Sequence, residues 1–159
     1  MSRMDISEKI NAVETIISYR FSNKSLLSDA LYAAGVPHIS SDGNWHPEGN
    51  KRPAIIGDTV LKLALMEAWY RTTSLTGLVG PFQAIMEIAT NENLDSVGKR
   101  LGLDKHVILA PGVDPTQVPW RTMAATVEAI LGAVYFDGGM VAVRQVMGKM
   151  GLVPALLTL

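Results

Sequence analysis

Residues 50–61 and 125–136 each place a single carboxylate within an otherwise apolar helical pattern. The carboxylate is Asp58 in the first segment and Glu128 in the second. A helix that buries most of its surface tolerates a charged side chain only where that charge is paired or solvated. We therefore expect both segments to be central helices of one core, with Asp58 and Glu128 at a site.

Apolar residues recur at helical spacing along most of the chain, and no segment shows the alternation typical of a half-buried strand. The stretch from 35 to 50 is rich in glycine and proline and is predicted to be a loop. The predicted helices span residues 5–18, 24–33, 53–71, 81–90, 91–101, 120–136 and 140–150. The sequence thus predicts an all-α fold.

Two details within these helices carry structural information. Gly57 inside a helix costs about 1 kcal/mol relative to alanine, so we predict a close helix contact at that position. Asp137, Gly138 and Gly139 are predicted to form a turn between the last two helices.

The length of 159 residues fits one domain, so we assign residues 1–159 to a single domain. Hydrophobic residues make up 48% of the chain and charged residues only 18%. This is apolar for a soluble domain and indicates surface that is buried against a partner. The simplest partner is a second copy of the chain.

The formal net charge of −1 argues against strong autonomous RNA binding, because phosphate recognition requires clustered Lys and Arg. The absence of cysteine excludes disulfides, thiolate metal sites and cysteine nucleophiles. The N-terminus resembles neither a signal peptide nor a transit peptide, and no apolar run reaches membrane-spanning length. We expect an intracellular protein, cytoplasmic or nuclear, that has no membrane segment.

The order of several motifs resembles the ribonuclease III family. Residues 50–61 read Asn-Lys-Arg-Pro-Ala-Ile-Ile-Gly-Asp-Thr-Val-Leu and resemble the family signature, which is of the type Asn-Glu-Arg-Leu-Glu-Phe-Leu-Gly-Asp. Residues 124–139 resemble the family's second conserved block. Residues 19–31 resemble the opening of the family's sequence, and residues 91–103 resemble the helix between the signature and the second block. The resemblance covers about residues 8–152.

This resemblance implies a ribonuclease III-like endonuclease-domain fold and an intertwined homodimer. It also implies a valley between subunits that accepts double-stranded RNA, and Mg²⁺-dependent endonucleolytic cleavage. The chain shows only the nuclease-like part, with no segment that matches a double-stranded-RNA-binding domain.

The candidate active site departs from the family pattern at three positions. Asp58 matches the catalytic aspartate and Glu128 matches a metal-ligating glutamate of the family. Lys51 and Ala54 replace the two signature glutamates, and Ala125 replaces the aspartate of the second block. Two of the four usual metal-binding carboxylates are therefore missing, and at most weak Mg²⁺ binding by Asp58 and Glu128 is expected.

Three interpretations of this altered site stay open. The ammonium group of Lys51 could lie between Asp58 and Glu128 and replace the charge of the missing ion. Residual metal binding is the second, and a polar site with a new use is the third. Glu92 is either a solvated surface acid or a supporting group of the site.

Other residues could line the cleft. Trp45, His46, Lys51 and Arg52 are candidates for binding a small molecule there. The three histidines, His38, His46 and His106, have no ligand-like spacing, so we predict no zinc site.

We favour a dimeric, catalytically impaired domain that acts in double-stranded RNA binding or processing, or as a ribonucleoprotein scaffold. One alternative is a residual Mg²⁺-dependent endoribonuclease. The other is an enzyme that converts a small molecule in the dimer cleft.

Overall fold

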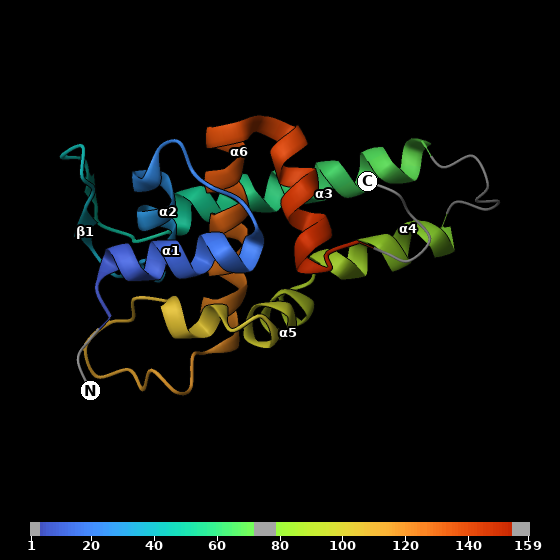
Figure 1. Ribbon diagram of the computed structural model, residues 1–159. Coiled ribbons are helices and arrows are strands. Elements are labelled where there is room, and N and C mark those ends of the chain that lie inside the picture. Colours follow the sequence, from blue (N-terminus) through green and yellow to red (C-terminus); the bar gives the residue numbers. More distant parts are fainter. Residues whose placement is uncertain (1–3, 72–78, 154–159) are drawn as a thin grey trace.

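The computed structural model describes residues 4–71 and 79–153, and the fold is mostly helical, as predicted (Figure 1). The α-helices are α1 (Ile6–Ile17), α2 (Lys24–Leu31), α3 (Lys51–Arg71), α4 (Val79–Met86), α5 (Asn91–Arg100) and α6 (Trp120–Met150). Two 3-10 helices, η1 (Glu87–Ala89) and η2 (Leu103–His106), and two short strands, β1 (His38–Ile39) and β2 (Trp45–His46), complete the description.

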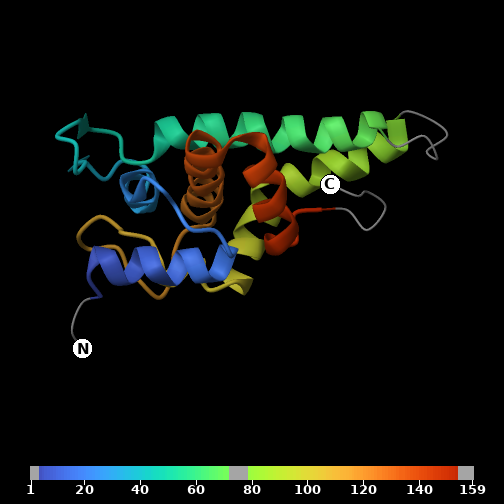
Figure 2. The ribbon, with the colours of Figure 1, turned by 45° about the horizontal axis from the view of Figure 1, so that its top comes forward.

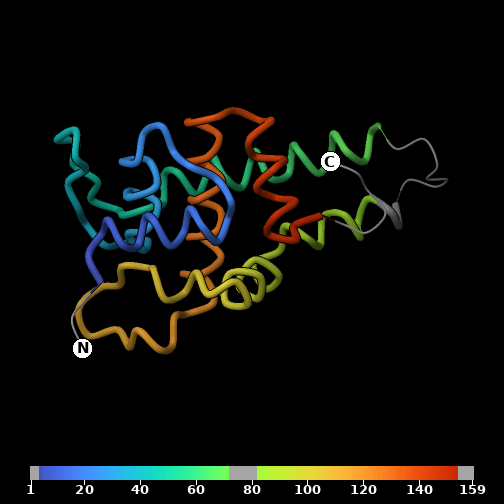
Figure 3. The backbone as a smooth tube through the Cα atoms, in the orientation of Figure 1, coloured from blue at the N-terminus to red at the C-terminus, as the bar shows by residue number. Residues whose placement is uncertain are grey.

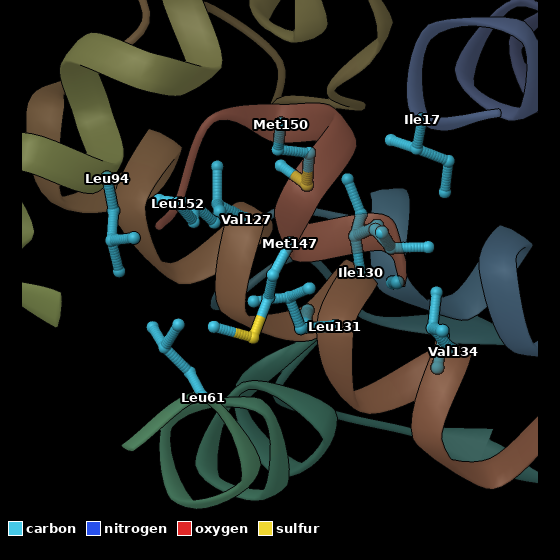
Figure 4. Packing of buried hydrophobic residues seen from close by; sticks show 14 of the residues in the cluster. Ile17, Leu61, Leu94, Val127, Ile130, Leu131, Val134, Met147, Met150 and Leu152 are labelled. Atoms are coloured by element: carbon cyan, nitrogen blue, oxygen red, sulfur yellow. The ribbon is translucent and has the colours of Figure 1, made fainter. Parts of the chain in front are cut away.

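Helices α3 and α6 cross at the centre of the molecule. Figure 2 shows α3 lengthwise, with the first half of α6 nearly end-on against it. The second half of α6 then doubles back beside the first (Figure 3). Met147 and Met150 from this second half are fully buried with Leu61 of α3 and Leu131 of α6 (Figure 4). The apolar faces of α1, α2 and α5 cover this centre with Ile17, Leu27, Leu31 and Leu94.

The crossing of α3 and α6 brings the two backbones into direct contact. A Cβ atom at Gly57 would overlap the carbonyl oxygen of Glu128, and one at Gly132 would overlap the carbonyl oxygen of Pro53. Both positions therefore require glycine for steric reasons. This confirms the prediction of a close helix contact at Gly57.

The buried Asn50 fixes the beginning of α3 against its neighbours. Its side-chain amide donates to the carbonyl oxygen of Ala30 at 2.9 Å and to Oγ1 of Thr126 at 3.2 Å. Its backbone N–H donates to the carbonyl oxygen of Tyr32 at 3.0 Å. One side chain thus connects α2, α3 and α6, which sets the direction in which α3 leaves the preceding loop.

The predicted turn between two helices at residues 137–139 is confirmed, because α6 consists of two helical halves that meet at a kink at Gly139. Only Gly139 departs from helical geometry, with φ 72° and ψ −170°. Asp137 anchors the kink by accepting hydrogen bonds from the Tyr19 hydroxyl at 2.7 Å and from the N–H groups of Ser22 and Asn23 at 2.9 and 2.8 Å. Burial alone would raise the pKa of Asp137, but these hydrogen bonds together lower it.

The predicted loop from 35 to 50 contains an antiparallel hairpin, which the sequence analysis missed. His38 lies opposite His46, and Ile39 lies opposite Trp45. Strands of two residues are too short for an alternating pattern to be recognised. Figure 1 shows the hairpin at one end of the molecule.

Several predicted helix boundaries also need correction. Helix α2 ends at Leu31 rather than at residue 33, and α3 begins at Lys51 rather than at residue 53. The predicted helix 81–90 is α4 followed by η1. Such differences are typical of helix ends, where caps and 3-10 turns compete.

The expectation that no segment reaches membrane-spanning length was wrong for α6. By length and composition alone this helix could cross a membrane, with a mean hydropathy of 1.4 in its most apolar stretch. Within the fold, 56% of that stretch is buried. Its apolar character is that of a central helix, which contacts neighbours on several sides.

We expect Gly57→Ala to destabilise the fold by at least about 2 kcal/mol, because the added methyl group must push α3 and α6 apart. Gly148→Ala in α6 is the matched control, since no atom lies within 4 Å of a Cβ added there. That control should be neutral or stabilise by up to about 1 kcal/mol. Urea unfolding of both variants measures the difference. A Gly57→Ala protein as stable as the parent would contradict the close crossing.

Candidate functional site

Asp58 of α3 and Glu128 of α6 line the same groove, beside the place where the two helices cross. Asp58 follows Gly57, which contacts the backbone of Glu128, so the two acids project next to the contact. The groove has a volume of ≈ 510 Å³. Its other lining residues are Lys62, Met86, Ala89, Thr90, Asn91, Glu92 and Trp120.

A lysine of α3 neutralises Asp58. The ammonium nitrogen of Lys62 lies 3.0 Å from Oδ1 and 3.2 Å from Oδ2 of Asp58. The two residues are four positions apart on one helix, which is a favourable spacing for an ion pair. Because both side chains are more than a third exposed, the pair contributes little to stability. Its significance is local: a cation already occupies the space beside the aspartate.

The pKa of Glu128 is strongly raised. Burial raises its pKa, and the negative charge of Asp58 raises it further, while Lys62 lowers it in part. The resulting pKa is about 7. Glu128 therefore holds its proton at higher pH than an ordinary glutamate does.

Lys51 is not the cation between the two acids, contrary to that interpretation of the sequence. It is exposed at the beginning of α3, and the described residues give it no ion pair. Lys51 precedes Asp58 by nearly two helical turns, whereas Lys62 follows it by about one. Lys62 was not predicted as this cation, although its spacing of four residues from Asp58 is visible in the sequence.

The neighbouring positions on the two helices carry no acid. Ala54 is buried and Ala125 is half-buried. Within the described part of the chain, the acids that line the groove are Asp58, Glu128 and the exposed Glu92.

The remaining predicted cleft residues do not gather in this groove. Arg52 and His46 line a separate hollow of ≈ 460 Å³, together with Leu26, Asp29, Pro53, Ile55, Ile56, Ala133 and Phe136. Trp45 lines neither space and is 60% exposed. The four residues predicted to line one cleft are therefore divided among different surfaces.

Asp29, which the sequence analysis did not single out, holds two histidines in this region. Its carboxylate oxygens lie 3.0 Å from Nε2 of His38 and 3.6 Å from Nε2 of His46. Burial raises the pKa of Asp29, although both histidines counteract part of that effect. No local spacing signalled this cluster, because its members come from α2 and from both strands of the hairpin.

Comparison with known proteins identifies the family of this chain. The sequence model of the Ribonuclease-III-like family matches residues 23–154. Ribonuclease 3 of Pseudothermotoga lettingae is 31% identical over 135 residues, which cover 82% of this chain and 56% of that protein. Ribonuclease 3 of Caldanaerobacter subterraneus subspecies tengcongensis is 30% identical over 138 residues, covering 84% and 58%. The chain belongs to the ribonuclease III family.

The solved structures agree on the fold. The nuclease domain of ribonuclease III from Campylobacter jejuni superposes with a TM-score of 0.68 at 19% identity, covering 89% of this chain and 95% of that domain. The chain spans less than two thirds of the length of the ribonuclease 3 proteins it matches. The similarity therefore concerns their nuclease domain.

The raised pKa of Glu128 predicts that stability falls as the pH increases. In the folded protein the pKa is about 7, against an ordinary value of 4.5, so the folded state holds a proton that the unfolded chain has lost. The resulting stabilisation is complete below about pH 4.5 and is lost as the pH rises through about 7, with a slope of at most about 1.4 kcal/mol per pH unit. Urea unfolding from about pH 5 to about pH 8, with a chelator present, measures it.

Glu128→Gln should remove this slope. Glu92→Gln is the matched control, since it removes an exposed acid of the same groove and should retain the slope. An unchanged slope in Glu128→Gln would mean that the proton is held elsewhere.

Proposed function

We propose that this chain is a dimeric ribonuclease III-like domain with impaired catalysis, which acts by binding double-stranded RNA or as a scaffold in a ribonucleoprotein. One observation carries the proposal: the ammonium group of Lys62 pairs with Asp58, 3.0 Å from its Oδ1. The groove therefore lacks the dense negative charge that binds a divalent ion. Phosphodiester hydrolysis with Mg²⁺ requires several hard oxygen ligands in fixed positions.

Magnesium binding at this groove has two costs. The ion must displace the ammonium group of Lys62 from Asp58, and it must also displace the proton that Glu128 holds near neutral pH. Ala54 and Ala125 offer no further carboxylates on the adjoining turns. We expect weak Mg²⁺ binding by Asp58 and Glu128 and no resident cofactor in the groove.

We propose that the dimer interface lies over the apolar hollow. Ile55 and Phe136 line it, and their exposed fractions are 67% and 58%. An exposed apolar surface of this kind indicates a protein contact. The Campylobacter jejuni structure is described in terms of a region involved in dimer formation of its nuclease domain. We propose that a second copy of the chain covers this hollow.

RNA binding by the dimer should be modest and sensitive to salt. The net charge of −1 provides no general attraction to phosphates, so any contact depends on local lysine and arginine side chains. Conversion of a small molecule is the second candidate function. The hollow is of ligand size and joins apolar walls to Arg52, Asp29 and His46, which favours it as the place for such a molecule.

Restoring the missing carboxylates tests the proposed impairment. We expect the parent protein to leave double-stranded RNA intact with Mg²⁺ or Mn²⁺. The triple variant Lys51→Glu, Ala54→Glu and Ala125→Asp should bind Mg²⁺ at least about tenfold more tightly, because it supplies oxygen ligands beside Asp58. Calorimetry with Mg²⁺ and RNA gel assays measure both effects.

Ala125→Asp alone is the milder variant, because position 125 is only half-buried. Adding Asp58→Asn to the triple variant should cancel the gain. Cleavage by the parent protein that disappears in Asp58→Asn and in Glu128→Gln would establish a working nuclease and overturn the proposal.

A single charge in the hollow should break the dimer. Ile55→Asp places a carboxylate on the proposed interface, and we expect the molecular mass from light scattering to fall to that of one chain at micromolar concentration. Val141→Asp is the matched control, since Val141 is 65% exposed and lies outside the hollow. A parent protein that is already monomeric would contradict the proposed interface.

A further inference from the structure

The hairpin holds two histidines on one face. His38 and His46 are directly opposite each other in the antiparallel register, so their side chains project to the same side. The two imidazole rings stack with centroids 4.8 Å apart and planes 10° from parallel. Tyr32 stacks on His38, with centroids 3.9 Å apart. This stack of three rings fixes the orientation of His38, which is only 6% exposed.

A carboxylate from another element closes this arrangement. Asp29 of α2 reaches Nε2 of both histidines, at 3.0 Å for His38 and 3.6 Å for His46. One ligand atom from each of the three side chains lies within 4.8 Å of the others. A hairpin that only closed over the core would not require two imidazoles and a carboxylate to converge in this way.

We propose that Asp29, His38 and His46 form a binding site for a divalent transition-metal ion, with Zn²⁺ as the best match. Two imidazoles and one carboxylate are the ligand set of zinc sites that keep one position open. Imidazole selects Zn²⁺ and similar ions over Mg²⁺ and Ca²⁺, which prefer oxygen ligands. The site is therefore chemically distinct from the pair Asp58 and Glu128.

Metal binding requires the three side chains to rearrange. Zinc binds nitrogen and oxygen at about 2.0–2.2 Å, so the ligand atoms around a tetrahedral ion lie about 3.4 Å apart. The ligand atoms, which lie within 4.8 Å of one another, must close in by up to about 1.4 Å, and the His46 ring must rotate out of its parallel stack on His38 so that both Nε2 lone pairs point at the ion. Asp29 and His46 also line the apolar hollow with Arg52, so an ion held by these side chains would adjoin that hollow.

Zinc titration of the untagged chain tests the site. The chain has three histidines and no cysteine, so no thiolate can take the metal. We expect one Zn²⁺ per chain by calorimetry, and an excess of Mg²⁺ should not displace it. Co²⁺ should give the visible absorption bands of a tetrahedral site. Asp29→Asn, His38→Gln and His46→Gln should each weaken Zn²⁺ binding at least about tenfold.

Two controls and one spectroscopic measurement complete the experiment. His106→Gln removes the remaining histidine, and Asp58→Asn removes the predicted magnesium ligand; both should leave Zn²⁺ binding unchanged. Nitrogen-detected NMR of the imidazole rings should show shifts for His38 and His46, and none for His106, when Zn²⁺ is added. This measurement uses the parent protein, so it does not depend on whether a variant folds.

Zinc binding weaker than about millimolar, or binding that survives His46→Gln, would overturn the proposal. So would loss of binding in either control, because the ion would then sit elsewhere. None of these outcomes depends on whether the protein cleaves RNA, so the site and the proposed function fail independently.

Discussion

The backbone contact between α3 and α6 determines where the functional side chains lie. Gly57 meets the Glu128 carbonyl, and Gly132 meets the Pro53 carbonyl, so the helices approach more closely than any side chain at these positions would allow. Dense packing transmits such a contact to its surroundings, since interiors of proteins have few voids to absorb a shift. The contact sets Asp58 beside Glu128 on one side. On the other side it sets the turn of α3 around Pro53 against the turn of α6 around Ala133.

The crossing also divides the surface into two unlike spaces. Asp58, Lys62 and Glu128 belong to the polar groove, whereas Pro53, Ile56 and Ala133 belong to the apolar hollow. The same two helices therefore build both spaces from adjoining turns. In the groove, pairing with Lys62 and the raised pKa of Glu128 reduce the negative charge at neutral pH. The charge of the groove and the shape of the fold can vary separately, because function depends on the site rather than on the fold.

Local patterns in the sequence predicted much of this architecture. Helical periodicity predicted the helices, and the energetic cost of Gly57 predicted the crossing. The motif order indicated that Asp58 and Glu128 share a site. The interpretation that Lys51 pairs with Asp58 was wrong, because Lys62 lies one helical turn away and takes that place. The cluster of Asp29, His38 and His46 could not be predicted, because it depends on how a short hairpin docks on α2.

Asp29 and His46 line the same hollow as Ile55 and Phe136. A second copy that covers the hollow would also cover the open position of an ion held by Asp29, His38 and His46. Metal binding and dimer formation would then change each other's free energy by equal amounts, since coupling between two binding equilibria is reciprocal. The sign of this coupling depends on which groups of the partner face the ion. Apolar groups would exclude water from the ion, whereas a polar group could supply the ion's fourth ligand. The apolar hollow, rather than the groove of Asp58 and Glu128, is therefore where the proposed metal site and the proposed dimer contact meet.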